Sequence, residues 1–219
     1  MKVRLISHSR TPLGPENEKT TQDLVAYAAR VSNPSNQNNK ETSEKLLKYL
    51  IKHKHWSPLE MASACLEIET TRDIARQILR HRSFSFQEFS QRYADPTQDL
   101  EFVTREARLQ DEKNRQNSIS TDDDVLKRSW EAKQQQLIHE CRLAYKWAIE
   151  NGIAKEQARA VLPEGLTMSR MYMNGTIRSW VHYIELRTAN GTQKEHMEVA
   201  EACAVEIAKI FPLISNIKE

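Results

Sequence analysis

The densest group of polar side chains in this 219-residue chain is the run Arg80-His81-Arg82, followed after seven residues by Ser90 and then by Arg92. Three basic side chains in a row repel one another unless an anion lies close by. The planar guanidinium group binds phosphate oxygens through two parallel hydrogen bonds. This stretch therefore predicts a binding site for an anion such as a phosphate group.

Arginine also recurs at helical spacing just before that run. Arg72, Arg76 and Arg80, here called the arginine row, follow one another at intervals of four residues. On a helix they share the face opposite the apolar side chains of Ile74 and Ile78. Because basic side chains near a helix C-terminus are favoured by the helix dipole, a solvated helix face remains the alternative to an anion site.

A third group of polar residues lies on a predicted helix over residues 176–187. Arg178 and His182 are four residues apart and share a face of that helix, and Arg187 lies near its end. A single histidine in such a helix is more often a structural residue than a catalytic one. The residue types alone therefore leave the role of this group open.

Hydrophobic periodicity predicts the elements that position these groups. Alternation predicts strands over residues 2–7, 62–69 and 167–173, and an extended segment over 84–93. Helical spacing predicts helices over residues 21–31, 42–54, 71–80, 122–151, 154–162, 176–187 and 192–211. Residues 94–124 are polar and indicate a surface excursion or a mobile insert. This order favours an α+β (mixed α/β) fold over a doubly wound parallel sheet.

Composition excludes several classes of protein. A net charge of +2 is not that of a polybasic protein, and no glycine-rich dinucleotide or nucleotide-phosphate loop is present. The chain has three cysteines, Cys65, Cys141 and Cys203, and none of them forms a CxxC motif. An odd number of cysteines without that spacing indicates a reducing, cytoplasmic compartment. We expect no metal site, since no second ligand pair follows His53, His55 and Glu60. No signal peptide or membrane span is expected.

The spacing of these groups resembles the flavin-dependent thymidylate synthases. The run from Arg80 to Arg92 matches the RHR-x7-S signature of that family in the extended form RHRxxSxxxxSxR. The other matching blocks are His55–Glu60 (HWSPLE), Ala158–Pro163 (ARAVLP), Arg178–Arg187 (RSWVHYIELR), and Gln193 with Glu195. The signature and the first three of these are four separate blocks in the right order, and Gln193 with Glu195 fits the tail, which makes the resemblance specific.

The resemblance implies a reaction, a fold and an assembly. Members of the family convert dUMP to dTMP, with methylenetetrahydrofolate as carbon donor, reduced FAD as hydride donor and NADPH as the reductant of the flavin. The implied fold is a curved antiparallel sheet flanked by helices, in a homotetramer whose subunits share active sites. Residues 1–219 then form a single catalytic domain with a variable helical insert at about 95–150.

The resemblance also implies two sets of site residues. The set for dUMP is Gln77, Arg80, Glu88, Phe89, Ser90, Gln91, Arg92, Arg159 and Arg187. The set for FAD is Ser32, His55, Ser57, Glu60, Arg80, His81, Arg82, Glu88, Thr176, Arg178 and His182. In the first set Ser90 and Arg92 correspond to phosphate ligands, and Arg187 is the catalytic residue beside the uracil ring. In the second, His81 is a flavin contact rather than a general base.

The chain departs from the family pattern at three positions. Gln87 stands where asparagine is commoner, Met61 where many members have histidine, and Thr176 where asparagine often contacts the flavin. The contact made by residue 176 is therefore an open question.

Two further expectations concern alternatives. A binder of single-stranded nucleic acid could combine the arginine row with stacking on Phe84, Phe86 and Phe89. The low net charge and the neighbouring Asp73 and Glu88 weigh against it. We also expect no cysteine nucleophile, because free cysteines usually pack as small apolar residues and no histidine, lysine or arginine lies within five residues of Cys65.

Overall fold

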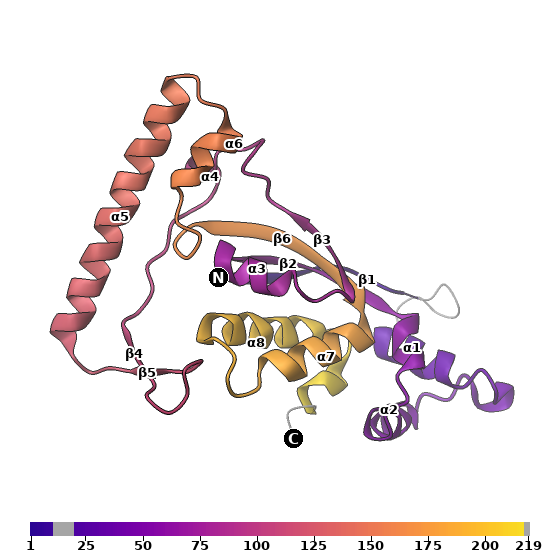
Figure 1. Cartoon of the computed structure of the whole chain (residues 1–219). Helices are drawn as coiled ribbons and strands as arrows, with labels where there is room; N and C mark the ends of the chain where they lie inside the picture. Colours follow the sequence, from indigo (N-terminus) through magenta and orange to yellow (C-terminus); the bar gives the residue numbers. More distant parts are fainter. Residues whose placement is uncertain (11–19, 217–219) are drawn as a thin grey trace.

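The computed structural model describes residues 1–10 and 20–216 and is organised around one antiparallel sheet. Its strands are β1 (Lys2–His8), β2 (Ser63–Thr71), β3 (Phe84–Glu88) and β6 (Met168–Thr176), in the order β1-β2-β6-β3. The central pair is in register along its whole length, from Ser63 opposite Thr176 to Thr71 opposite Met168. The sheet is long and bent (Figure 1). The predicted antiparallel α+β arrangement is confirmed.

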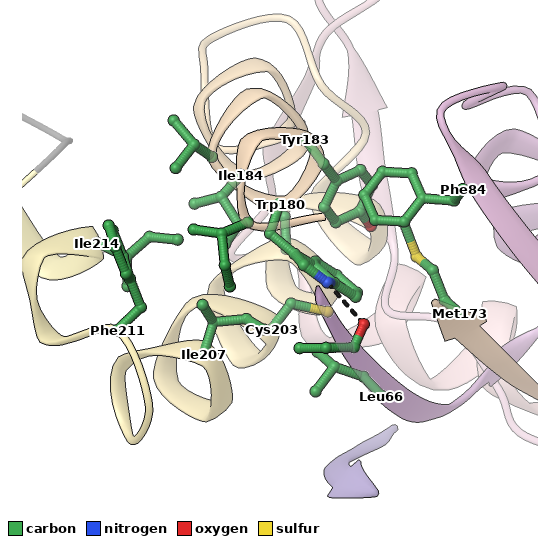
Figure 2. Packing of buried hydrophobic residues seen from close by; sticks show 14 of the residues in the cluster. Leu66, Phe84, Met173, Trp180, Tyr183, Ile184, Cys203, Ile207, Phe211 and Ile214 are labelled. Carbon is green, nitrogen blue, oxygen red and sulfur yellow. Dashed lines mark hydrogen bonds between the residues drawn. The ribbon is translucent and has the colours of Figure 1, made fainter. Parts of the chain in front are cut away.

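Helices α7 (Ile177–Arg187) and α8 (Lys194–Ala208) cover one face of the sheet (Figure 1). Between them lies the main core, where Trp180, Tyr183 and Phe84 pack edge to face (Figure 2). The Trp180 Nε1–H donates to the carbonyl of Ala64 in β2 at 3.0 Å, which satisfies the polar edge of a fully buried ring. The core therefore holds α7 rigidly on the sheet.

Two helices each follow a central strand directly. Helix α3 (Arg72–Ile78) continues from β2, and α7 continues from β6. Since β2 and β6 are antiparallel, the two helices begin at opposite ends of the sheet. Their C-terminal ends lie close together: His81, three residues after α3, is hydrogen-bonded to Arg187, the last residue of α7.

The N-terminal helices form a smaller layer beside the sheet. Helix α1 (Thr21–Ala29) begins with a capping box between Thr20 and Asp23, as the threonine at its start predicts. Helix α2 (Ser43–Lys52) and three 3₁₀ helices, η1 (Pro34–Asn36), η2 (Ser57–Met61) and η4 (Pro212–Asn216), complete this region. The proline expected at the start of η2 is in place.

Residues 95–161 form an arm that extends from the sheet (Figure 1). It contains α4 (Pro96–Asp99), the hairpin of β4 (Arg108–Gln110) and β5 (Ser118–Ser120), α5 (Asp124–Glu150), α6 (Lys155–Ala158) and η3 (Arg159–Val161). A bridge from Phe102 to Thr167 and a hydrogen bond from Val103 N–H to Leu166 O tie its first part to the start of β6. The predicted insert is thus continuously helical only from Asp124. Before that point its polar side chains bind neighbouring elements.

Other boundaries differ modestly from the sequence prediction. Helix α3 ends at Ile78, so Arg80 lies beyond the helix. The extended segment over 84–93 divides into β3 and a turn, because the N–H groups of Tyr93 and Ala94 both bind the carbonyl of Ser90. Within the part of the chain that the structure describes, no helix is long and apolar enough to cross a membrane.

Candidate active site

At the meeting point of α3 and α7, Arg187 donates its Nε–H to His81 Nε2 at 2.9 Å. Because a guanidinium group only donates, His81 Nε2 carries no proton and the ring is neutral. Burial, together with the charge of Arg187, lowers the pKa of His81 to about 4. His81 therefore fixes the direction of the Arg187 side chain as a neutral acceptor.

Buried residues support this pair from behind. The His81 ring meets Tyr183 edge to face at 4.9 Å, and the Tyr183 hydroxyl lies 3.1 Å from His196 Nε2. His196 Nδ1 is 3.1 Å from Oε1 of Gln77. Burial, with the nearby charge of Arg187, lowers the pKa of His196 to about 3. We call these five residues the histidine cluster.

A second group, the arginine cluster, lies where β3 ends. Its members are Arg72, Arg76, Arg92 and Arg159 with the acidic residues Glu88, Glu156 and Glu164. The buried Arg72 lies 3.5 Å from Glu88, and Arg76 lies 3.1 Å from Glu164. Ser169 donates to Glu88 at 2.8 Å. The cluster is thus rich in guanidinium groups that are held by carboxylates.

The turn over residues 90–93 completes the arginine cluster. Arg92 lies 3.5 Å from Glu156, whose backbone carbonyl also accepts from Arg159 Nε at 3.2 Å. Gln91 is buried in this turn, and its Nε2 has no hydrogen-bond partner among the described residues. A buried donor without a partner is costly, so it fits an acceptor supplied by a ligand.

A third group joins η2 to the start of α7. Glu60 and Arg178 form an ion pair at 2.6 Å, and the rings of Trp56 and His182 lie 4.4 Å apart. The Thr176 hydroxyl accepts from the Ser179 N–H at 3.2 Å as the N-cap of α7. This cap assigns residue 176 a structural role, whatever else it contacts.

Comparison with known proteins gives a consistent result. A family model described as thymidylate synthase complementing protein matches residues 16–213. A probable flavin-dependent thymidylate synthase of Paramecium bursaria Chlorella virus 1 is 50% identical over 99% of this chain and 98% of its own length. A flavin-dependent thymidylate synthase of Synechocystis is 45% identical over 98% of each chain. The chain belongs to the flavin-dependent thymidylate synthase family.

Solved structures agree with this family. A UMP/dUMP methylase, PolB from Streptomyces cacaoi, bound with 5-Br dUMP, superposes with a TM-score of 0.81 at 26% identity. The match covers 99% of this chain and 93% of that one. The mixed helical and antiparallel-sheet fold expected for a flavin-dependent thymidylate synthase is therefore present.

The structure divides the residues expected to bind dUMP into two groups. Gln77 and Arg187 belong to the histidine cluster, whereas Glu88, Arg92 and Arg159 belong to the arginine cluster. No hydrogen bond or ion pair between described residues joins the two clusters. Sequence order alone did not indicate this separation.

The residues expected to bind FAD are also spread over several places. Glu60, Arg178 and His182 come together, whereas Ser32 lines a separate hollow of about 460 Å³. His55 is exposed, with its ring 6.1 Å from that of Tyr49. Ser57 is exposed at the start of η2.

A flavin dinucleotide fits the side chains that remain open. Arg80 and Arg82 are exposed, and neither side chain has a hydrogen bond or ion pair with another described residue. Free guanidinium groups suit a pyrophosphate, and Trp56 and His182, whose rings are inclined at 59°, offer aromatic side chains beside which a ring system could pack. Among the described residues, no group of three or more histidine, cysteine, aspartate or glutamate side chains is placed so that it could hold a metal ion.

Two interpretations made from local spacing are wrong. The alternative that the arginine row is a solvated helix face fails at Arg72, which is 6% exposed and pairs with Glu88, and Arg80 lies beyond the helix end. The run from Arg80 to Arg82 does not hold three cations, since His81 is neutral. Both errors have one cause: local spacing does not reveal partners distant in sequence.

The three cysteines are unpaired; Cys141 and Cys203 are buried and Cys65 is partly buried. Burial raises the pKa of Cys65, Cys141 and Cys203, so all three thiols stay protonated at neutral pH. Cys203 is fully buried in the core beside Trp180 (Figure 2). The expectation that no cysteine acts as a nucleophile therefore gains physical support.

Sequence reasoning missed several residues that shape this site. His196 and Tyr183 lie behind His81, and Trp56 faces His182. A fully buried histidine at the start of a helix has no local signature, since its partners come from α3 and α7. The only sequence signal was its place one residue after the motif residue Glu195.

Proposed function

We propose that this protein converts dUMP to dTMP as a flavin-dependent thymidylate synthase. The observation that carries the proposal is the contact between Arg187, a residue of the expected dUMP set, and His81, a residue of the expected FAD set. One hydrogen bond thereby connects the proposed substrate and cofactor sites. The two relatives that cover nearly the whole chain support the same reaction.

Arg187 is the proposed catalytic residue. A fixed cation beside the uracil ring favours loss of the N3 proton and so increases electron density at C5. His81 holds that cation in place without adding a competing charge. Bound reduced FAD supplies the hydride, methylenetetrahydrofolate the carbon, and NADPH the electrons that regenerate the flavin.

The arginine cluster is the proposed site of the dUMP phosphate. Ser90, Arg92 and Arg159 offer a hydroxyl and two guanidinium groups, and Gln91 offers an unpartnered donor. Glu88 of the same cluster and two residues outside both clusters, Arg80 and Phe89, complete the proposed dUMP set together with Gln77 and Arg187. These donors match a phosphate dianion in charge and in hydrogen-bonding capacity.

Residues from several separate parts of the chain are proposed to hold FAD. Arg80 and Arg82 would bind the pyrophosphate, with His81 and Glu88 beside the ring system. The others are Ser32, His55, Ser57, Glu60, Thr176, Arg178 and His182. The separation of Ser32 from the remainder fits an extended dinucleotide better than a small ligand.

We further propose a homotetramer with shared active sites, in which residues 1–219 form one catalytic domain with a variable insert at about 95–150. Helix α5 stands apart from the sheet and exposes large apolar side chains, among them Trp130 and Trp147 (Figure 1). Such a face typically packs against a partner chain. A cytoplasmic location agrees with three unpaired cysteines.

The nucleic-acid alternative is not supported. Phe84 is buried against Trp180, and Phe86 packs on the same core, so neither ring is free to stack on a base. Arg72 of the arginine row is buried beside Glu88, so the row does not form the continuous basic surface that the nucleic-acid hypothesis needs.

Purified protein tests the proposal directly. We expect a flavin absorbance spectrum that changes on addition of dUMP, and dTMP formation that requires methylenetetrahydrofolate and NADPH. Dilution that dissociates the oligomer should release FAD, since the site is completed by a neighbouring subunit. Colourless protein that binds no FAD would contradict the proposed flavin-dependent activity. A monomer that retains all of its FAD would contradict the proposed sharing of active sites between subunits.

A further inference from the structure

Gln77 lies within a chain of hydrogen bonds that runs from the buried Tyr183 and His196, through partly buried side chains, to the arm. Its Nε2 donates to Gln193 Oε1 at 2.8 Å, and Gln193 Nε2 donates to Glu195 Oε2 at 2.9 Å. On the other side, Gln77 Oε1 lies 3.1 Å from His196 Nδ1, and His196 Nε2 lies 3.1 Å from the Tyr183 hydroxyl. Five side chains from α3, α7 and the start of α8 thus form one continuous path.

The carboxylate at one end determines the direction of every bond in this path. Glu195 can only accept, so Gln193 must point its NH₂ group toward it and its oxygen toward Gln77. Gln77 must then point its NH₂ toward Gln193 and its oxygen toward His196. His196 must donate from Nδ1, which leaves Nε2 as the acceptor of the Tyr183 hydroxyl.

Glu195 stays ionised because the arm holds it. Arg105 lies 3.1 Å from one carboxylate oxygen, and Arg108, just before the hairpin turn, lies 2.5 Å from the other. Burial alone would raise the pKa of Glu195, but the hydrogen bonds from Arg108 and Gln193 and the charge of Arg105 outweigh it and lower the pKa. Arg105 is itself held by Asp73 at 2.7 Å.

We propose that Glu195, Gln193 and His196 are positioning residues that hold the Gln77 amide in one orientation toward dUMP. The inference rests on the proposed function, which places Gln77 in the dUMP site. The path uses one N–H and one oxygen lone pair of that amide, and it leaves one N–H and one lone pair for the substrate. Because an amide flip would exchange donor for acceptor, a fixed orientation selects a nucleotide with matching groups.

The histidine tautomer gives a direct test that does not depend on catalysis. Two-bond ¹⁵N–¹H correlation spectra of ¹⁵N-histidine-labelled protein distinguish the two neutral tautomers. We expect His196 to be the neutral Nδ1–H form at pH 7. A neutral Nε2–H form, or a protonated ring, would reverse the path and overturn the proposal.

Two variants on opposite sides of His196 distinguish a role in orienting the Gln77 amide from a role in packing the core. Gln193→Met cuts the link to Glu195 and leaves the ion pairs of that carboxylate intact, so Gln77 can rotate. Tyr183→Phe removes a partner of His196 but leaves Gln77 anchored. We expect the first to give a mixture of His196 tautomers and the second to keep the Nδ1–H form. Gln98→Met on α4 is the matched control, since Gln98 is exposed and lies outside the path.

Affinity for dUMP is the second measurement, by equilibrium dialysis with the FAD-loaded protein. Losing one oriented hydrogen bond should weaken dUMP binding by about 3- to 10-fold in Gln193→Met. Gln98→Met should match the parent. If the parent forms dTMP and Gln193→Met keeps both its tautomer and its dUMP affinity, the positioning role is wrong. A parent that binds no dUMP instead refutes the proposed function.

Discussion

The histidine cluster and the arginine cluster stabilise charge in opposite ways. In the first, two neutral histidines and a tyrosine lie around the single, partly buried cation Arg187, and Tyr183 and His196 behind it are fully buried. In the second, Arg72 is buried beside Glu88, but the outer guanidinium groups pair with exposed carboxylates, as in Arg92 and Glu156, whose side chains are 59% and 50% exposed. One region is fixed in advance, and the other can exchange its partners.

This difference matches two different tasks. An exposed ion pair contributes only about 0–1 kcal/mol, so a phosphate can replace Glu156 as the partner of Arg92 at little cost. A cation whose direction is already fixed by a hydrogen bond needs no rearrangement during reaction, which favours stabilisation of charge that develops in the transition state. The comparison therefore assigns substrate capture to the arginine cluster and chemistry to the histidine cluster.

The largest effect should come from replacing the partly buried cation of the histidine cluster. Arg187→Lys keeps the charge but loses the planar group that donates to His81. We expect kcat to fall about 100-fold while KM for dUMP changes little, because the lost contact acts mainly in the transition state. Steady-state kinetics measure this. A rise in KM with unchanged kcat would assign Arg187 to ground-state binding.

Acidification should weaken the histidine cluster before the arginine cluster. The pKa of His196 is about 3 in the folded protein against 6.5 unfolded, so the unfolded chain binds more protons between these values. The stabilisation is complete above pH 6.5 and decreases as the pH falls, by about 2 kcal/mol at pH 5.

Urea unfolding at pH 7.5, 6 and 5 measures that decrease. His196→Gln should reduce the pH dependence, whereas His139→Gln, at an exposed position on α5, should leave it unchanged. An equal pH dependence in the parent and in His196→Gln would show that the buried ring does not titrate as proposed.

A smaller effect should follow from replacing the exposed cation. Arg92→Lys retains a positive charge and loses bidentate binding, so KM for dUMP should rise about 10-fold with kcat nearly unchanged. The same kinetic assay applies. If Arg92→Lys and Arg187→Lys give the same pattern, the division of tasks between the two clusters fails.

The smallest effect should come from the cysteines, which belong to neither cluster. In a variant that combines Cys65→Ala, Cys141→Ala and Cys203→Ala, dTMP formation should stay within about tenfold of the parent, since loss of a true nucleophile costs orders of magnitude more. Thermal unfolding and FAD content control for damage to the core around Cys203. A folded, FAD-loaded triple variant without activity would identify a required thiol.

Much of the architecture could be predicted from periodicity. The alternation along residues 62–69 appears in β2, the apolar faces appear in α2 and α7, and Pro58 begins η2. These features depend on neighbours in the chain, so local sequence suffices for them. Residues 95–123 were harder, because their polar side chains find partners far away, as Arg105 does with Asp73 and Glu195.

The sequence by itself determined the chemical groups available and the family to which they belong. The spacing from Arg80 to Arg92 and the block from Arg178 to Arg187 are properties of the chain. Only the tertiary structure decided which groups carry charge and which partners they bind. His81 is neutral because burial and Arg187 disfavour a second cation, and Arg72 is buried because Glu88 lies beside it. Burial and distant partners arise on folding, and no local spacing encodes them.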